Sequence, residues 1–434
     1  MLIQFLFVLV AIIIGARIQG IGLGVMGGLG LAILVFGFGL EPTSPPIDVM
    51  LMIVAVIAAA GCMQAAGGLD LMVSLAEKLL RKHPHRITLL SPIVTYLFTF
   101  VAGTGHVAYS VLPVIAEVAR ETKIRPERPL SIAVIASQQA ITASPISAAT
   151  VALLSMLAGY NISLLNILMI SIPATLVGVL LGAFVSMRMG KDLHEDPEYL
   201  KRLEEGMFNE DKKKTVTNLK LKSRAGLSVL IFILATVFII LFGSIENLRE
   251  VGGRKLDMPI IIEILMLTAA ALILLSTKTN GIKAAQGSVF VAGMQAVVAI
   301  FGIAWMGDTF IHGNMTQLKD SIEGVVKSMP WIFGVALFVM SILLYSQAAT
   351  VRALMPLGLV LGISPWMLIA LFPTVNGYFF LPNYPTVVAA INFDRTGTTR
   401  IGRWILNHSF MLPGLVATIA AVCTGLLIIT LIGY

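Results

Sequence analysis

The chain contains a succession of apolar segments, each about 20 residues long or longer. Segments of that length are typical of transmembrane helices, because about 20 helical residues span the hydrocarbon layer of a bilayer. Of the 434 residues, 57% are hydrophobic and only 12% are charged, which is about half the charged fraction usual in soluble domains. The sequence therefore predicts an all-α polytopic membrane protein.

Ten of these segments are expected to cross the membrane. They are 2–15, 20–40, 47–66, 130–158, 164–187, 226–243, 259–277, 287–311, 365–392 and 404–431. Two further apolar segments, 88–119 and 330–361, are interrupted near the middle by polar and small residues, and we expect both to be re-entrant hairpins. Non-helical backbone is tolerated at membrane depth only where protein or a wet cavity covers it. Both hairpins therefore indicate a lined cavity.

The distribution of basic residues predicts the orientation of the chain. When the spans and hairpins are laid out in order, most of the 30 Lys and Arg residues fall on one side of the membrane. The positive-inside rule identifies that side as cytoplasmic, so both termini lie on the opposite side. The first segment lacks a basic start and a small-residue cleavage site, and we interpret it as an uncleaved span rather than a signal peptide.

The same layout divides the chain into two halves of opposite orientation. Residues 1–187 and 226–434 each contain five spans and one hairpin, and residues 188–225 form a charged cytoplasmic linker. Each half also contains one span broken by proline among polar residues, at 130–158 and 365–392. Such halves form an inverted-topology repeat, and paired interruptions at corresponding positions are the best sequence indication of a transporter's binding site.

Each half has one polar cluster in its hairpin and another in its broken span. They are GTGH at 103–106 and TASPIS at 142–147 in the first half, and SQAAT at 346–350 and PNYPT at 382–386 in the second. A break in a helix exposes backbone N–H groups and the positive end of a helix dipole. Four converging breaks would bind an anion from opposite directions, and a dianion with a carboxylate at each end would fit two mirrored halves. The alternative is that the breaks only permit kinks and helix packing.

The candidate binding residues lie in these clusters or beside them. From the first half they are Thr104, Gly105, His106, Gln138, Thr142, Ser144, Pro145 and Ser147. From the second half they are Ser346, Gln347, Thr350, Arg352, Asn376, Pro382, Asn383 and Thr386.

Two of these candidates have clear alternatives. Arg352 is the only basic residue expected at membrane depth, where an ionisable group is costly and indicates function. It could instead snorkel towards the outside or pair with an acid. The acids considered are Glu263, Asp70 and Asp308. His106 lies at the break of the first hairpin, where a structural hydrogen bond is almost as well supported as a binding role.

No motif supports an enzyme, a cofactor or a metal. Residues 22–27 match G-x-G-x-x-G, but they lie inside an apolar run rather than between a strand and a helix, as a dinucleotide site requires. Gly20, Gly24 and Gly28 recur at four-residue spacing, which favours close helix packing in the membrane. The two cysteines have no metal or disulfide spacing. The net charge of +7 follows from topology and does not indicate nucleic acid.

Ten motifs are specific enough to suggest a family. They are GAR at 15–17, AGGLD at 66–70, GTGH at 103–106, RPERP at 125–129, ASPIS at 143–147, GIAWMGDTF at 302–310, SQAA at 346–349, YPT at 384–386, FDRTGTTRIGR at 393–403 and NHSFMLPG at 407–414. In these motifs the chain resembles, over essentially its whole length, the anaerobic C4-dicarboxylate transporter (Dcu) family. The GTGH motif is similar to that of the fumarate–succinate antiporter branch. The basic residue in SQAATVRALMP is similar to that of the branch that also transports aspartate.

The resemblance implies a carrier in the lipid of the bacterial inner membrane, with both termini periplasmic. It would exchange or take up fumarate, succinate, malate and aspartate. Resemblance to the wider ion-transporter superfamily implies a homodimer in which a mobile domain carries both hairpins and both broken helices, as in an elevator-type transporter. The hairpin tips lack the Ser-Asn-Thr signature of the sodium–dicarboxylate carriers, so the resemblance does not imply a sodium site.

Three functional hypotheses remain open from the sequence. The first is dicarboxylate exchange by alternating access. The second is uptake coupled to a proton or sodium ion. The third is a membrane sensor that binds dicarboxylate and signals through the linker. A channel is disfavoured, because closed hairpins with proline-containing arms do not suggest a continuous pore.

Overall fold

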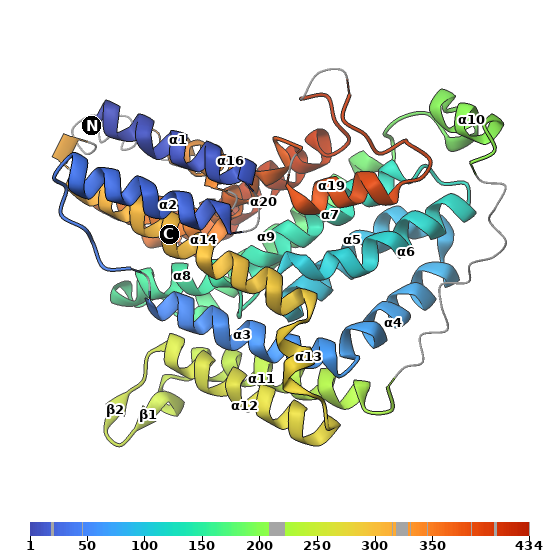
Figure 1. Ribbon diagram of the computed structural model, residues 1–434. Coiled ribbons are helices and arrows are strands. Elements are labelled where there is room, and N and C mark those ends of the chain that lie inside the picture. The colour runs from blue at the N-terminus through green and yellow to red at the C-terminus, as the bar shows by residue number, and fades with distance from the viewer. Residues whose placement is uncertain are drawn as a thin grey trace.

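The protein is a bundle of long helices with one short antiparallel ribbon, β1 (Glu250–Val251) and β2 (Arg254–Lys255) (Figure 1). The computed structural model describes the chain except for residues 19–20, 46, 208–221, 315, 318–328, 330, 345, 383, 403–405 and 434. In that described part, seven helices are long and apolar enough to cross a membrane, or eight if one bent pair counts as a single span. The protein is therefore a multi-pass membrane protein.

The first half of the chain forms the helices that precede the linker. They are α1 (Leu2–Ile18), α2 (Gly22–Ala32), α3 (Ile47–Ala65), α4 (Gly68–Lys82), α5 (Ile87–Ala102), α6 (Ala108–Glu121), α7 (Glu127–Ala143), α8 (Ala148–Leu157) and α9 (Leu164–Ser186). The hairpin segment 88–119 corresponds to α5 and α6, joined by a short turn that includes a 3-10 helix, η3 (Gly105–Val107). The broken span corresponds to α7 and α8.

The second half begins after a short linker helix, α10 (Pro197–Glu204). Its helices are α11 (Ala225–Ser244), α12 (Met258–Thr277), α13 (Gly281–Ala285), α14 (Ser288–Gly313), α16 (Trp331–Leu344), α17 (Gln347–Val360), α18 (Pro365–Leu371), the 3-10 helix η7 (Phe372–Phe379), α19 (Pro385–Phe393) and α20 (Met411–Leu431). The described part of the second hairpin corresponds to α16 and α17, and the broken span to α18, η7 and α19.

Helix α4 lies between the predicted span 47–66 and the predicted hairpin 88–119, where no helix was expected from the sequence. Leu69, Val73 and Leu80 are buried along one face of the helix, while charged residues occupy the other face. Because this amphipathic pattern has no uniformly apolar run, hydropathy alone does not reveal it. Gly67, with φ of +85°, precedes α4 and permits the 69° bend between α3 and α4.

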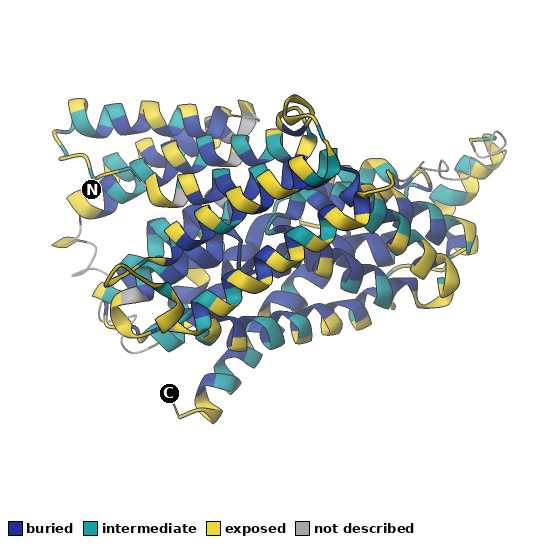
Figure 2. Cartoon of the chain, turned by 90° about the horizontal axis from the view of Figure 1, so that it is seen from below, coloured by how far each residue is buried: buried dark blue, intermediate teal, exposed yellow. Residues whose placement is uncertain are grey.

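The helices pack in two groups. In the first helix group, α1 packs on α2, α2 on α14, α14 on α3, α3 on α12, and α12 on α11. The second helix group contains both two-helix hairpins, both broken spans, α9 and α20, with α5 on α7, α7 on α9, α9 on α20, and α16 on η7. Buried residues gather in the middle of the molecule, whereas exposed residues line the outward faces (Figure 2). Many exposed side chains there are apolar, such as Leu230 and Leu267, as expected of surfaces that face lipid.

The two halves repeat the same pairwise contacts. The pair α1–α2 corresponds to α11–α12, and the pair α2–α14 corresponds to α12–α3. Likewise, α5 packs on α7 as α16 packs on η7. The second helix of each hairpin contacts the second part of the other half's broken span, since α17 packs on α8 and α6 packs on α19. Each half therefore packs against the other through its hairpin and its broken span.

Glycines allow α2 and α14 to approach closely. A Cβ atom on Gly24 would lie 2.0 Å from the carbonyl oxygen of Val298, and one on Gly302 would lie 1.8 Å from the carbonyl oxygen of Gly24. The predicted packing role is therefore confirmed for Gly24. It is wrong for Gly28, whose Cβ position has no heavy atom within 4 Å. Gly20 lies outside the described residues.

We expect Gly302→Ala to destabilise the protein. The new methyl group meets backbone that has no room to yield, and such overpacking costs about 1–3 kcal/mol. The measurement is the melting temperature of the purified protein in detergent. Gly28→Ala is the matched control, because its methyl group enters open space. Equal melting temperatures for the two variants would contradict the close packing of α2 and α14.

Candidate functional site

The break between α7 and α8 is stabilised by side-chain hydroxyls. Ser147 Oγ donates to the carbonyl oxygen of Ile141 at 2.6 Å, so it satisfies a carbonyl that the interrupted helix leaves free. Ser144 Oγ donates to the carbonyl oxygen of Phe100 on α5 at 2.7 Å. The break is therefore tied to the arm of the first hairpin, and residues 142–147 are all buried.

The tip of the first hairpin lies against this break and against α7. A Cβ atom on Gly103 would lie 2.9 Å from the Ile146 side chain, and one on Gly105 would lie 3.9 Å from Gln138 Nε2. Thr104 Oγ1 accepts a hydrogen bond from the backbone N–H of His106 at 3.4 Å. The tip is thus a tight turn whose glycines allow it to reach the polar face of α7.

The tip of the second hairpin reaches the same part of α7. Gln347 Nε2 lies 3.4 Å from Gln138 Oε1 and 3.5 Å from the Gln138 carbonyl oxygen, and it donates to Asn376 Oδ1 at 2.8 Å. Ser346 Oγ caps α17 by accepting from the backbone N–H of Ala349 at 3.2 Å. Both hairpin tips therefore contact Gln138, from opposite halves of the chain.

The broken span of the second half completes the cluster. Asn376 lies inside η7 with non-helical backbone angles, and its Nδ2 donates to Gln139 Oε1 at 3.2 Å and to Thr142 Oγ1 at 3.3 Å. Gln138 Nε2 donates to Thr386 Oγ1, near the start of α19, at 3.1 Å. We call this cluster the amide network. Its members are Gln138, Gln139, Thr142, Gln347, Asn376 and Thr386.

Apart from Arg352 and Asn383, the candidate residues fall into two sets in the structure. The amide network joins Gln138, Thr142, Gln347, Asn376 and Thr386, and Gly105 lies beside Gln138. The others near the four interruptions are Thr104, His106, Ser144, Pro145, Ser147, Ser346, Thr350 and Pro382, of which the Ser and Thr residues mainly bond to backbone. Asn383 lies outside the described residues. Substrate binding by any of them stays a prediction.

Arg352 lies outside the amide network, more than one turn beyond the second hairpin tip. Its Nε is buried without a hydrogen-bond partner in the described part of the chain. The acids whose charge acts on it are Asp308 of α14 and Asp48 near the start of α3. A Cβ atom on Gly307 would lie 3.4 Å from Ala353 Cβ, so α14 and α17 touch here. Of the acids that the sequence offered, Asp308 is the one that faces Arg352.

Sequence reasoning missed three residues of this region. Gln139 Nε2 donates to Thr418 Oγ1 of α20 at 3.1 Å, and the rings of Tyr378 and Tyr384 stack with centroids 4.7 Å apart. Gln139 could have been found, because α7 is buried on every side and each polar group inside it needs a partner. Tyr384 lies inside the predicted polar cluster at 382–386 and could also have been found there, whereas Tyr378 is followed by apolar residues and gave no comparable signal.

The amide network contains donors without charge. Its described members are amides and hydroxyls. The amide nitrogens of Gln138, Gln347 and Asn376 donate to other members, and that of Gln139 donates to Thr418. Such groups can bind carboxylates through several neutral hydrogen bonds. Because their present partners are one another, an incoming carboxylate would replace these bonds rather than fill an unsatisfied site.

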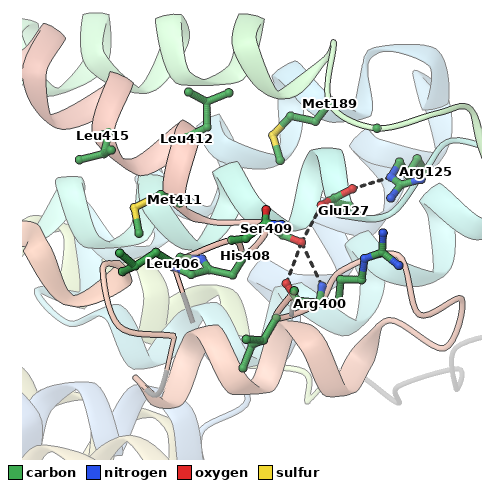
Figure 3. Close-up of a pocket in the computed structure, with 14 residues that line it drawn as sticks. Arg125, Glu127, Met189, Arg400, Leu406, His408, Ser409, Met411, Leu412 and Leu415 are labelled. Carbon is green, nitrogen blue, oxygen red and sulfur yellow. Dashed lines mark hydrogen bonds and ion pairs between the residues drawn. The ribbon is translucent and has the colours of Figure 1, made fainter. Parts of the chain in front are cut away.

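A cavity of about 660 Å³ lies at the other end of α7 (Figure 3). On its polar side, Ser409 Oγ donates to Glu127 Oε1 at 2.7 Å, and Arg125 bonds to Glu127 at 2.5 Å. On its apolar side lie Leu412 and Leu415 of α20. Three of the motifs that carry the family resemblance meet at this cavity, namely those at 125–129, 393–403 and 407–414.

The linker docks beside the cavity through Asp196. Arg125 donates to Asp196 Oδ2 at 2.5 Å. Burial opposes ionisation of Asp196, but hydrogen bonds from Arg125 and from the backbone N–H groups of Tyr199 and Glu198 outweigh it and hold the pKa of Asp196 below its ordinary value. Docking of the linker is therefore intact at neutral pH, and it weakens only as the pH falls through that depressed pKa.

Comparison with known proteins identifies the family. Residues 1–433 match the family described as anaerobic C4-dicarboxylate membrane transporter. The chain belongs to this family. Its members are membrane transporters rather than enzymes. The activity to be explained is therefore the transport of C4-dicarboxylates across a membrane.

Several characterised relatives are similar over nearly their whole length. The C4-dicarboxylate transporter DcuA of Escherichia coli K12 is 45% identical over 428 residues, which cover 98% of each chain. The DcuA of Wolinella succinogenes is 44% identical over 427 residues, again 98% of each chain. The anaerobic C4-dicarboxylate transporter DcuB of Escherichia coli O6:H1 is 41% identical over 441 residues, covering 100% of this chain and 99% of the relative.

Comparison with solved structures found the following similarity. The YdaH transporter of Alcanivorax borkumensis aligns with a TM-score of 0.46 and 15% identity over 98% of each chain.

We expect Gln347→Leu to impair C4-dicarboxylate transport at the binding step. The substitution removes an amide donor that would bind a carboxylate and leaves Asn376 Oδ1 without the donor that Gln347 provides, and an unsatisfied buried group costs roughly 1–3 kcal/mol. The apparent KM for uptake into proteoliposomes should rise about tenfold, since 1.4 kcal/mol corresponds to a factor of ten. Gln286→Leu, at an exposed glutamine next to α13, is the matched control. An unchanged KM for Gln347→Leu would exclude the amide network from the site.

Proposed function

We propose that the protein carries C4-dicarboxylates, including fumarate, succinate, malate and aspartate, across the bacterial inner membrane by one-for-one exchange. The observation that carries this proposal is the amide network, because the second hairpin tip and both broken spans contribute to it from the two halves of the chain, with Gly105 of the first hairpin tip beside Gln138. Sites built at paired interruptions of transmembrane helices are typical of carriers that work by alternating access.

The pattern of contacts supports an inverted-topology repeat. Residues 1–187 and 226–434 would form its halves, joined by the linker 188–225, with both termini periplasmic. The same pairs of helices pack in each half, and each hairpin contacts the other half's broken span. Two halves related by a pseudo-two-fold axis in the membrane plane would produce this reciprocity.

The site would bind the two carboxylates of the substrate from opposite directions. Thr104, Gly105, His106 and the break at Thr142–Ser147 would approach one carboxylate, and Ser346, Gln347, Asn376 and the segment at 382–386 would approach the other. In the unloaded state the amides bond to one another. Substrate would exchange these bonds for charge-assisted ones, which are roughly twice as strong.

The two helix groups support an elevator mechanism. The second helix group contains every interruption and would carry the site, while the first helix group would form the scaffold of a homodimer. Arg352 and Asp308 face each other where these groups meet, on α17 and α14. Their attraction would hold one position of the mobile group and would have to weaken as that group moves.

The cavity at the end of α7 fits a cytoplasmic vestibule for this site. Arg400 lines it together with Arg125 and Glu127. Because Arg125 pairs with Glu127 and Asp196, Arg400 is the lining residue whose positive charge would raise the local concentration of a dianion. His408 in its wall bonds to the carbonyl oxygen of Phe380 at 3.2 Å, directly before the 382–386 segment. Leu415 lies in the same wall, one turn of α20 before Thr418, the partner of Gln139.

Exchange makes a definite prediction for the purified protein. Proteoliposomes preloaded with succinate should accumulate labelled fumarate, and empty proteoliposomes should accumulate little, because the unloaded polar site crosses the apolar barrier slowly. The measurement is initial uptake with and without internal succinate. Uptake into empty vesicles that requires an imposed proton or sodium gradient would instead support coupled uptake.

The interface charges give a separate prediction. Asp308→Asn and Arg352→Gln should each slow fumarate exchange, because removing one partner leaves the other charge buried and uncompensated. The double variant should lose less activity than the sum of the single losses, as expected of residues that interact. The measurement is the initial exchange rate at saturating fumarate. Asp70→Asn, at an exposed acid on α4, is the control, and strictly additive losses would contradict the pairing.

A further inference from the structure

Tyr378 has a buried hydroxyl group without a hydrogen-bond partner. Only 1% of the residue is exposed, and its hydroxyl oxygen lacks a partner in the described part of the chain. Buried polar groups are almost always hydrogen-bonded, so each exception needs an explanation. A serine or threonine hydroxyl inside a helix can turn to a carbonyl of the preceding turn. A phenol cannot, because its ring holds the hydroxyl away from its own backbone.

The hydroxyl lies where the second hairpin tip meets the second broken span. Tyr378 follows Asn376 by two residues at the end of η7. The backbone N–H of Gln347 acts as a donor towards the phenol oxygen, but it falls short of full hydrogen-bond geometry, and the O–H proton of Tyr378 has no acceptor in the described part of the chain. Gln347 belongs to the amide network, as does Asn376, two residues before Tyr378 in the sequence.

The orientation of the Tyr378 ring is fixed by a second tyrosine. The ring of Tyr384 stacks on it at 4.7 Å with an angle of 25° between the planes. Tyr384 also interacts with Gln138 of the amide network and with Tyr109 of α6, whose ring stacks on His106 at the first hairpin tip. Stacking on Tyr384 therefore limits how the Tyr378 ring can turn, and Tyr384 connects it to Gln138 of the amide network.

We propose that the Tyr378 hydroxyl donates a hydrogen bond to one carboxylate of the transported dicarboxylate and makes the site selective for substrates that carry both carboxylates. This proposal deepens the proposed function and rests on it. An O–H group that donates to a carboxylate forms a short, charge-assisted bond. The carboxylate supplies the acceptor that the phenol lacks, whereas the amides around it already have partners.

The selectivity follows from the cost of leaving this group unpaired. A site that is built to hydrogen-bond a substrate group discriminates strongly against an analogue without that group, because its own buried donor then stays unsatisfied. Crotonate matches fumarate in shape but has a methyl group in place of one carboxylate. It should therefore bind to the protein much more weakly than fumarate does, and part of that difference should depend on Tyr378.

The test is Tyr378→Phe in the full-length protein reconstituted with internal succinate. The apparent KM for fumarate should rise about tenfold, while the maximal rate stays within about twofold, because the ring and its stacking remain. The ratio of the inhibition constant of crotonate to the KM of fumarate should fall by a similar factor. Tyr160→Phe, at an exposed tyrosine beyond α8, is the matched control and should match the wild type.

The melting temperature in detergent distinguishes binding from a structural role. Without fumarate, Tyr378→Phe should melt at or above the wild-type temperature, because removing an unsatisfied buried hydroxyl costs nothing. With fumarate, its stabilisation should be smaller than that of the wild type. An unchanged KM and crotonate ratio, or a lower melting temperature without fumarate, would overturn the role of Tyr378 alone. Failure of the wild type and of Tyr160→Phe to exchange or bind any dicarboxylate would overturn the proposed function, and this role with it.

Discussion

The structure depends on how interrupted helices satisfy their polar groups inside an apolar environment. A break at membrane depth frees backbone groups that no water can reach, and each unsatisfied group costs several kcal/mol. Hydroxyls close the break after α7, where Ser144 and Ser147 donate to carbonyl oxygens. Amides then join this break to the other half through Gln138 and Asn376. The four interruptions must therefore lie together, because each supplies partners that the others lack.

The same bonds give the site its behaviour without substrate. Gln347 donates to Asn376, and Asn376 donates to Gln139, so the unloaded network is nearly satisfied by itself. A ligand gains only the difference between its own hydrogen bonds and those it replaces. Carboxylates have that advantage because bonds to a charged acceptor are stronger than bonds between neutral groups. A neutral molecule of the same shape offers no such gain, so the network favours anions although it contains no cation among its described members.

Much of this arrangement could be predicted from the sequence, for physical reasons that also explain the failures. Uniform apolar runs located the long helices, and polar residues among prolines located the interruptions, because both patterns reflect the bilayer directly. Helix α4 was not predicted, because its buried apolar residues are interspersed with charged residues along the sequence. Asp308, whose charge acts on Arg352, was one of three acids that the sequence offered, because a sequence does not state which helices touch. Tyr384 lies in the predicted cluster at 382–386 but was not among the candidates. Tyr378 could not be chosen, since a tyrosine in an apolar context is usually a core residue and only the fold shows that its hydroxyl lacks a partner in the described part of the chain.

A neutral site also determines what kind of transport is energetically reasonable. A dianion bound by neutral donors crosses with two negative charges, whereas the empty site crosses with none. Moving one charge through the membrane potential costs about 2.3 kcal/mol per 100 mV, so net uptake of a dianion into a negative interior would cost about twice that without compensating cations. In an exchange of fumarate for succinate, both directions carry the same charge and the two costs cancel. Charges fixed on the protein return to their starting side in each cycle, so only a co-transported cation or a counter-transported dianion could cancel the charge of the substrate. This is the electrostatic argument for the exchange that we propose.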